Sequence, residues 1–232
     1  ASLSSVPIVC DADTGFGGLL NVAHTVKGYE AAGAAAIQLE DQEFPKKCGH
    51  TPGRKVIPIE QAVAKIKVAV EARSSPEFLI VARTDARETE GLEAAIRRGR
   101  AYADAGADVL FVESPESEEE MRRIGEALGD KPLLVNVVEG GKTPQLTKQR
   151  YIELGYQMAI YPATGFLALG KALEGVYSSI KATGDSLGCK DQLADFKGFC
   201  LTMGFQGVWD FDKKHADLED ECKESLAKKA RS

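Results

Sequence analysis

The stretch FLIVARTD, residues 78–85, sets the pattern from which the fold follows. Its first five residues are apolar and include β-branched side chains, which is typical of a buried strand. Polar and charged residues follow at once, so the strand ends at a polar site. Amphipathic helical patterns flank it at Ile59–Ala72 and Leu92–Ala105. This stretch therefore predicts a strand that connects two helices.

The same unit recurs along the chain. The predicted strands are Val6–Cys10, Ala35–Leu39, Phe78–Ala82, Val109–Val112, Pro132–Val137 and Met158–Tyr161. The predicted helices are Leu19–Ala32, Ile59–Ala72, Leu92–Ala105, Ser117–Leu128, Lys148–Leu154 and a longer Thr164–Ala182. Strict alternation of strand and helix implies a parallel sheet with right-handed crossovers.

Polar residues follow five of the six predicted strands, and in a closed parallel barrel these strand ends share one face. An open doubly wound sheet would place ligands in a crevice instead, but the chain has no GxGxxG fingerprint. We predict an α/β fold of the (β/α)₈ TIM-type barrel class. Because such a barrel needs eight strands, the first two β/α units are expected to be missing. We expect a partial barrel over residues 1–187 and a helical extension over 188–232, with helices at Gln192–Met203 and Asp212–Lys229.

Composition narrows the range of partners. A formal charge of −6 and a pI near 5.3 argue against nucleic acid and against an anionic membrane surface, because both require clustered positive charge. No apolar stretch approaches the roughly 18 residues of a membrane span, so a cytoplasmic location is expected. The 5 cysteines are odd in number and form no CxxC, which indicates reduced thiols rather than disulfides or a zinc site.

The segment DADTGFGG, residues 11–18, directly follows the first predicted strand. Asp11 and Asp13 point to the same side and can face one cation, directly or through its waters. Carboxylate oxygens without nearby histidine or cysteine suit Mg²⁺, or Mn²⁺ in its place. Glu40 and Glu113, at neighbouring strand ends, support this interpretation. The alternative is that the aspartates only cap the following helix.

The segment KKCGH, residues 46–50, lies in the long loop Asp41–Pro58, which is a candidate lid. Cys48 directly follows two lysines and lies two residues from His50, and this positive potential favours the thiolate. Such a sulfur carries protons efficiently near neutral pH. The alternative is an incidental basic loop without a chemical role.

Arg83 closes the third predicted strand within an otherwise acidic face. Its guanidinium can make two parallel bonds to a substrate carboxylate. The alternative is an ion pair with Glu40 or Glu113 that only balances charge. Asn136, after the fifth strand, would orient a substrate oxygen, or cap a helix.

With these residues in place, the sequence resembles the isocitrate lyase/phosphoenolpyruvate mutase superfamily, and most of all its lyases of the 2-methylisocitrate lyase and 2,3-dimethylmalate lyase type. The resemblance rests on six segments in the family's order, within residues 11–166: DADTGFGG, QLEDQEFPKKCGH, VARTDAR, AGADVLFVE, NVVEGGKTP and AIYPATGF. KKCGH is the most specific of them, because the family's lyases carry this cysteine and its phosphonate enzymes generally do not.

The resemblance implies roles for the residues. Asp11 would bind Mg²⁺ directly, with Asp13 and Glu40 holding its waters. Cys48 would be the acid/base, supported by Lys46 and His50. The residues expected to contact the substrate are Gly49, Arg83, Glu113, Asn136 and Pro162. The reaction would cleave a methylisocitrate- or dimethylmalate-like 2-hydroxy acid into a 2-oxoacid and a carboxylate.

The resemblance also implies a homodimer or homotetramer in which the last barrel helix is exchanged between subunits. Three alternatives stay open. The chain could act on oxaloacetate as a hydrolase or decarboxylase, act on phosphonates as a mutase or hydrolase, or be a truncated homologue without catalysis. Pro162 weighs against the oxaloacetate hydrolase, and Cys48 against phosphonate chemistry.

Overall fold

The computed structural model describes residues 4–229. The chain divides between Phe166 and Leu167 into two compact units. The sequence placed a domain boundary at residue 187, after the long helix, and that boundary stays a prediction.

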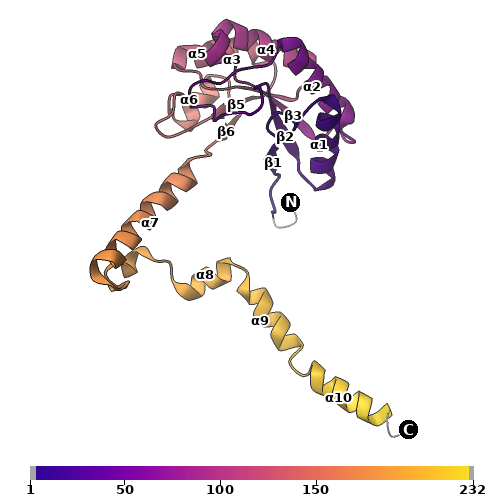
Figure 1. The fold of residues 1–232 in the computed structure, drawn as a ribbon, viewed down its shortest axis with the longest axis vertical. Coiled ribbons are helices and arrows are strands. Elements are labelled where there is room, and N and C mark those ends of the chain that lie inside the picture. Colours follow the sequence, from indigo (N-terminus) through magenta and orange to yellow (C-terminus); the bar gives the residue numbers. More distant parts are fainter. Residues whose placement is uncertain (1–3, 230–232) are drawn as a thin grey trace. The chain divides into compact units, whose positions relative to one another are not determined.

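The first unit contains a parallel sheet of six strands in the order β1-β2-β3-β4-β5-β6 (Figure 1). The strands are β1 (Val9–Asp11), β2 (Ala36–Glu40), β3 (Leu79–Thr84), β4 (Val109–Val112), β5 (Leu133–Asn136) and β6 (Met158–Ile160). Each strand pairs with its successor in the sequence, which is the connectivity of a (β/α) barrel. The fold is therefore α/β with a parallel half-barrel. The expectation that this chain lacks the first two β/α units stays a prediction.

Helices follow the strands in turn, as Figure 1 shows. They are α1 (Leu19–Ala31), α2 (Ile59–Ala72), α3 (Ala86–Glu90), α4 (Leu92–Asp104), α5 (Glu118–Leu128) and α6 (Lys148–Glu153). Their starts have local causes. At α5, the hydroxyl of Ser117 accepts a bond from the backbone N–H of Glu120 at 3.1 Å, and three glutamates in the first turn complement the helix dipole.

Two apolar clusters lie on opposite faces of the sheet. The larger one joins the strands to the helices and includes Ile37, Ile80, Leu110 and Leu133. The smaller one lies on the inner face of the half-barrel and consists of Ala36, Val81, Val109, Phe111 and Leu134, with Met158 and Ile160 against it. Since side chains alternate along a strand, the four central strands, β2 to β5, contribute to both clusters.

The predicted strands and barrel helices are confirmed to within a few residues. The short helix α3 was not predicted, because its five mostly polar residues carry no apolar periodicity. No helix in residues 4–229 is long and apolar enough to cross a membrane.

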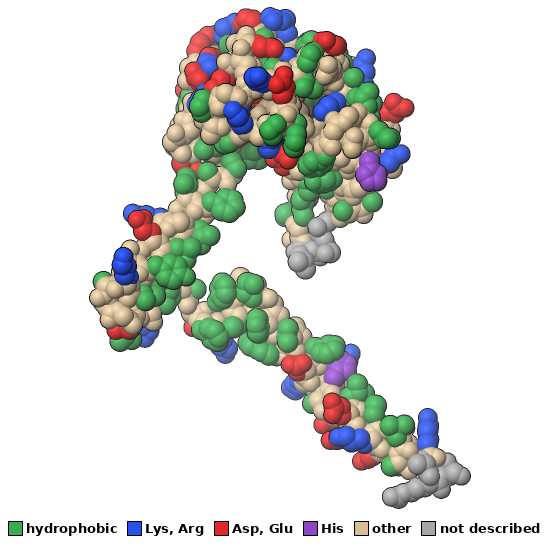
Figure 2. Space-filling model, viewed as in Figure 1, with side chains coloured by type: hydrophobic (Ala, Val, Ile, Leu, Met, Phe, Trp, Pro, Cys, Tyr) green, Lys and Arg blue, Asp and Glu red, His purple; other side chains and the backbone are tan. Residues whose placement is uncertain are grey.

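The second unit is helical. It comprises most of α7 (Thr164–Thr183), a 3₁₀ turn at Leu187–Gln192, α8 (Phe196–Thr202), α9 (Phe205–Lys214) and α10 (Leu218–Lys229). The single helix predicted over Asp212–Lys229 is wrong, since α9 ends before His215 and α10 begins at Leu218. The helix predicted over Gln192–Met203 is shorter than expected. Many large apolar side chains of these helices are exposed, as the green side chains of Figure 2 show.

Candidate active site at the strand ends

Alternation along the strands selects the residues that line the inner face. Val81, Phe111 and Leu134 belong to the inner cluster, and residues two positions further along point to the same side. The residues at the strand ends of this face are Glu40, Arg83, Glu113 and Asn136, and all four are buried. The structure thus brings together side chains that the sequence placed on four separate strands.

Lys46 holds three carboxylates of this face together. Its ammonium nitrogen lies 2.7 Å from Asp13, 3.8 Å from Asp11 and 3.9 Å from Glu40. The turn that positions the aspartates is fixed by the backbone N–H of Asp13, which donates to Asp11 at 2.9 Å. Burial alone would lower the pKa of Lys46, but Asp13, Glu40 and Asp11 together raise it. The ammonium of Lys46 therefore partly neutralises three carboxylates.

Glu40 is the least satisfied of these carboxylates. It is 3% exposed, and neither carboxylate oxygen has a hydrogen-bond partner among residues 4–229. Burial raises the pKa of Glu40 to about 7, although Arg83 and Lys46 act in the opposite direction. A buried carboxylate in this state is stabilised by any further cation that approaches it.

The donor set fits a hydrated divalent ion. Within the described residues, no three His, Cys, Asp or Glu side chains are grouped closely enough to enclose a metal by themselves. Mg²⁺ does not require such a cage, because it retains several waters and needs only one or two carboxylates. Two observations indicate a place suited to positive charge: the oxygens of Glu40 have no hydrogen-bond partner among the described residues, and the ammonium of Lys46 lies between Asp11 and Asp13.

Arg83 is tied to the inner face by several carboxylates. It makes two parallel bonds to Asp85, from Nε at 2.8 Å and from Nη2 at 2.9 Å. It also lies 3.4 Å from Glu113 and 3.6 Å from Glu40, and its guanidinium carbon lies 5.1 Å from the centre of the Phe111 ring. Burial would lower the pKa of Arg83, but Glu113 and Asp85 raise it, so it stays charged. The predicted ion pairs are present, and substrate binding by Arg83 stays a prediction.

The loop of residues 41–58, here called the thiol loop, lies directly on this site. Gly49 approaches so closely that a Cβ there would lie 2.6 Å from Arg83 Nη2 and 2.7 Å from Glu113 Cδ. Ser114, which follows Glu113, donates its hydroxyl to the carbonyl of Gly49 at 2.6 Å. Only glycine fits between these groups, so the predicted place of Gly49 beside the substrate residues is consistent with the geometry.

His50 is fixed by both ring nitrogens. Nδ1 accepts a bond from the backbone N–H of Lys142 at 3.1 Å, so in the neutral ring Nε2 carries the proton and faces Glu113 at 3.2 Å. Burial lowers the pKa of His50, with further lowering by Arg54, Arg83 and Lys142, against the raising effect of Glu113. Asn136 donates to the other oxygen of Glu113 at 3.2 Å. With Arg83 and the hydroxyl of Ser114, four side chains contact the carboxylate of Glu113.

Cys48 is an exposed free thiol, next in sequence to Gly49 and thus at the edge of the site. Its carbonyl accepts bonds from the N–H and the hydroxyl of Thr51 at 3.0 and 2.8 Å. Lys46 faces the carboxylates, and its support of Cys48 stays a prediction. Pro162 is exposed in the turn after β6, and its contact with substrate also stays a prediction. Of the other cysteines, Cys222 is also an exposed free thiol, whereas Cys189 and Cys200 are buried.

Asp41 and Asp85 were expected among the polar residues at the strand ends, whereas Arg54 and Lys142 were not predicted. Asp85 has a local signal, since it lies two residues after Arg83 and shares its side of the chain. Arg54 and Lys142 have none, because each meets a carboxylate more than 30 residues away in the sequence. Asp41 is also buried, where it accepts bonds from the hydroxyl of Tyr102 at 2.6 Å and from the backbone N–H of Asp85 at 2.9 Å.

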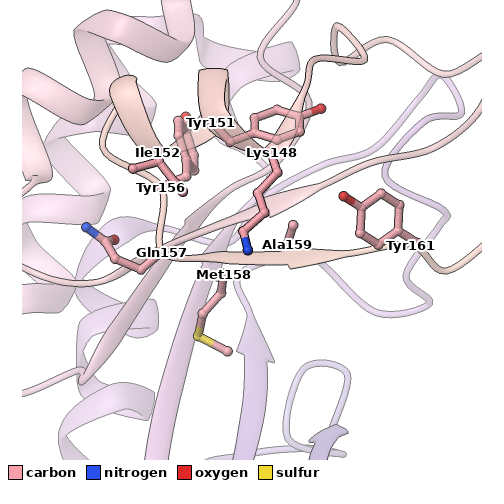
Figure 3. Close-up of a pocket in the computed structure, with 8 residues that line it drawn as sticks. All are labelled: Lys148, Tyr151, Ile152, Tyr156, Gln157, Met158, Ala159 and Tyr161. Atoms are coloured by element: carbon pink, nitrogen blue, oxygen red, sulfur yellow. The ribbon is translucent and has the colours of Figure 1, made fainter.

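A separate pocket of about 260 Å³ lies beside α6 and β6 (Figure 3). Its lining residues are Lys148, Tyr151, Ile152, Tyr156, Gln157, Met158, Ala159 and Tyr161. None of them is a carboxylate, a histidine or a thiol. Tyr156 is buried there, and its hydroxyl has no partner among the described residues. This pocket is therefore not part of the acidic site.

Comparisons with known proteins agree with this geometry. The family model for phosphoenolpyruvate phosphomutase matches residues 1–181. The chain is 46% identical to 2,3-dimethylmalate lyase of Eubacterium barkeri over 213 residues, 92% of this chain and 73% of that protein. It is 44% identical to 2-methylisocitrate lyase of Aeropyrum pernix over 223 residues, 96% of this chain and 70% of that protein.

Among solved structures, phosphonopyruvate hydrolase in complex with oxalate and Mg²⁺ superposes with a TM-score of 0.81 and 30% identity. That match covers 93% of this chain and 75% of the other. The residues matched by the family model include all the candidate site residues.

Proposed function

Because this chain belongs to the phosphoenolpyruvate phosphomutase family, within the superfamily that also contains the isocitrate lyases, we propose that it is a carbon–carbon lyase. The substrate class is a small 2-hydroxy di- or tricarboxylate, similar to dimethylmalate or methylisocitrate. The products are a 2-oxoacid and a second carboxylate. The relatives named as lyases support this proposal.

One observation carries the proposal. Arg83 and the carboxylates of the inner face meet at the strand ends, and the thiol loop lies on them with Gly49 in contact. A positive fork, a cation-binding acidic group and a thiol at the edge are the three elements that cleavage next to a carboxylate requires.

The acidic group would hold Mg²⁺, with Mn²⁺ as a substitute. Asp11 would bind it directly, and Asp13 and Glu40 would hold its waters. When bound, the ion supplies positive charge beside the oxygens of the substrate. The oxygens of Glu40, which have no hydrogen-bond partner among the described residues, support this assignment, as does the Mg²⁺ in the structure of phosphonopyruvate hydrolase.

The protein's own residues would bind and protonate the substrate. Arg83 would donate from one edge of its guanidinium to a substrate carboxylate, while Glu113 and Asn136 orient a neighbouring oxygen. A general base would take the hydroxyl proton, the C=O bond of the 2-oxoacid would form as the C–C bond breaks, and the electron pair of the C–C bond would stay on the carbon next to the second carboxylate. The Cys48 thiol would give its proton to this carbon, and the thiol loop would exclude water meanwhile.

The active form is proposed to be a homodimer or homotetramer with exchange of α7. This helix exposes apolar side chains on its own chain: Phe166, Leu167, Leu169, Leu173 and Tyr177. The pocket beside α6 and β6 presents a complementary surface of tyrosine and aliphatic side chains. Burial of both surfaces by a second copy would remove apolar area from water.

The test is direct. The protein, supplied with Mg²⁺, is given a panel of 2-hydroxy diacids, and pyruvate and glyoxylate are measured. Cys48→Ala should reduce kcat about 10²- to 10⁴-fold, since a positioned proton donor contributes this much. Full activity of Cys48→Ala would refute the proton role of the thiol. Phosphate release from phosphonopyruvate without cleavage of any diacid would favour phosphonate hydrolysis and refute the lyase proposal.

A further inference from the structure

We propose that Glu88 of α3 is a positioning residue that links the two loops over the site, so that the thiol loop closes only together with the loop of residues 137–147, here called the β5–α6 loop. This inference rests on the proposed function, because the closed arrangement matters through Cys48. Glu88 touches none of the residues proposed to bind substrate or metal.

The first link is to the thiol loop. Arg54, near the end of this loop, donates from Nε to Glu88 at 2.7 Å and from Nη1 to Asp85 at 2.6 Å. A further bond runs from its Nη2 to Glu88. Arg54 is 4% exposed, and a buried guanidinium is strongly destabilised when it loses its partner. The position of the loop therefore depends on the carboxylates that face Arg54.

The second link is to the β5–α6 loop. The ammonium of Lys142 donates to the other oxygen of Glu88 at 2.8 Å. Burial would raise the pKa of Glu88, but Lys142 and Arg54 lower it, so the carboxylate is charged and can serve both cations at once. One side chain thus joins two segments that are far apart in the sequence.

The two loops also meet at His50. The backbone N–H of Lys142 donates to His50 Nδ1, and His50 faces Glu113 at the centre of the site. A shift of Lys142 would withdraw the bond that orients His50, next to Gly49 and Cys48. Two sets of contacts therefore connect Glu88 to the loop that carries Cys48. One runs through Arg54, and the other runs through Lys142 and His50.

The simpler interpretation is that Glu88 only stabilises the fold locally. The two interpretations differ in a measurable way. A local role predicts a change near Arg54 alone or a uniform loss of stability. A shared anchor predicts that both loops loosen together, and that a change at Lys142 reaches the thiol loop, to which Lys142 does not belong.

Hydrogen exchange measured by mass spectrometry tests this on the whole chain, with peptides that cover residues 45–53 and 138–143. Glu88→Gln keeps the shape and removes the charge, and it should speed exchange in both peptides about tenfold, with a similar loss in kcat and little change in Mg²⁺ affinity. Lys142→Met should speed exchange in residues 45–53. Glu126→Gln, which breaks an exposed pair with Arg122 on α5, is the matched control and should change neither peptide.

Faster exchange in one peptide only, or in neither, would overturn the inference. If Glu88→Gln unfolds the chain, the Lys142→Met result decides alone. This variant removes only the ammonium that pairs with Glu88, and it keeps the backbone N–H that donates to His50. The exchange result does not depend on turnover. Coupled loops in a protein that cleaves no diacid would therefore refute the proposed function and keep the link, while an active lyase with independent loops would do the opposite.

Discussion

Replacement of Gly49 by alanine should separate activity from stability. The backbone of Gly49 does not adopt a positive φ, so alanine introduces no backbone strain there. The obstacle is space. The new Cβ would lie 2.6 Å from Arg83 Nη2 and 2.7 Å from Glu113 Cδ and Cγ, whereas ordinary contacts between heavy atoms are about 3.5–4.0 Å.

Arg83 and Glu113 cannot easily yield, because both are buried and bonded to each other and to neighbours. Overpacking of this kind typically costs about 1–3 kcal/mol. This cost lowers the ratio of closed to open conformations of the loop about 5- to 150-fold. The loop can escape by opening, so the rest of the fold is not strained. In the unfolded chain, alanine is less free than glycine by about 0.4–1 kcal/mol. We expect a lower kcat and an unchanged or slightly higher Tm.

The assay compares kcat and thermal unfolding of Gly49→Ala with those of Gly28→Ala. Gly28 lies within α1, and a Cβ added there would have no neighbouring atom within 4 Å, so Gly28→Ala should raise stability by about 0.5–1 kcal/mol and leave kcat unchanged. A Gly49→Ala protein with the activity of the wild type would refute the close approach of the loop. A protein destabilised by several kcal/mol would show that the loop cannot open without disturbing the rest of the fold.

Three further predictions concern charge and burial. Lys46→Met should tighten Mn²⁺ binding about tenfold, measured by electron paramagnetic resonance, because it removes a competing cation from Asp13; weaker binding would refute this competition. The lowered pKa of His50 means that the unfolded chain takes up its proton first as the pH falls below about 6.5. The free energy of unfolding should therefore decrease below that pH, and His50→Gln should decrease less in urea titrations; equal slopes would contradict the assignment. Tyr156→Phe should leave stability unchanged or raise it by about 1 kcal/mol, since its buried hydroxyl has no partner among the described residues; a clear loss in Tm would indicate a hidden partner.

Local patterns predicted the strands and the residues that end them. Arg83 and Glu113 were found because each follows an apolar run at a position where parallel strands share one face. Asp11 and Asp13 were found through their spacing of two. These signals lie within a few residues of the chain, and the order of the strands then brings them together without any long-range information.

Contacts between loops left no such signal. Arg54 pairs with Glu88 across 34 residues and Lys142 with Glu88 across 54, and each residue alone resembles any surface charge. The break between α9 and α10 at His215 was missed for a related reason. The charge pattern of the segment continues through it, and no glycine or proline marks the turn.

The two-sided use of each strand has a consequence for how this protein can change. The outward residues of a strand pack against the helices, whereas the inward residue at its end faces the shared site and contacts the inward residues of other strands, as Glu113 contacts Arg83 and Asn136. Exchange of Asn136 or Glu113 therefore alters reactivity at a position outside the larger apolar cluster. In such a fold, the residue at the end of one strand can be exchanged without changing the others. The outward apolar residues continue to stabilise the packing of the sheet on the helices.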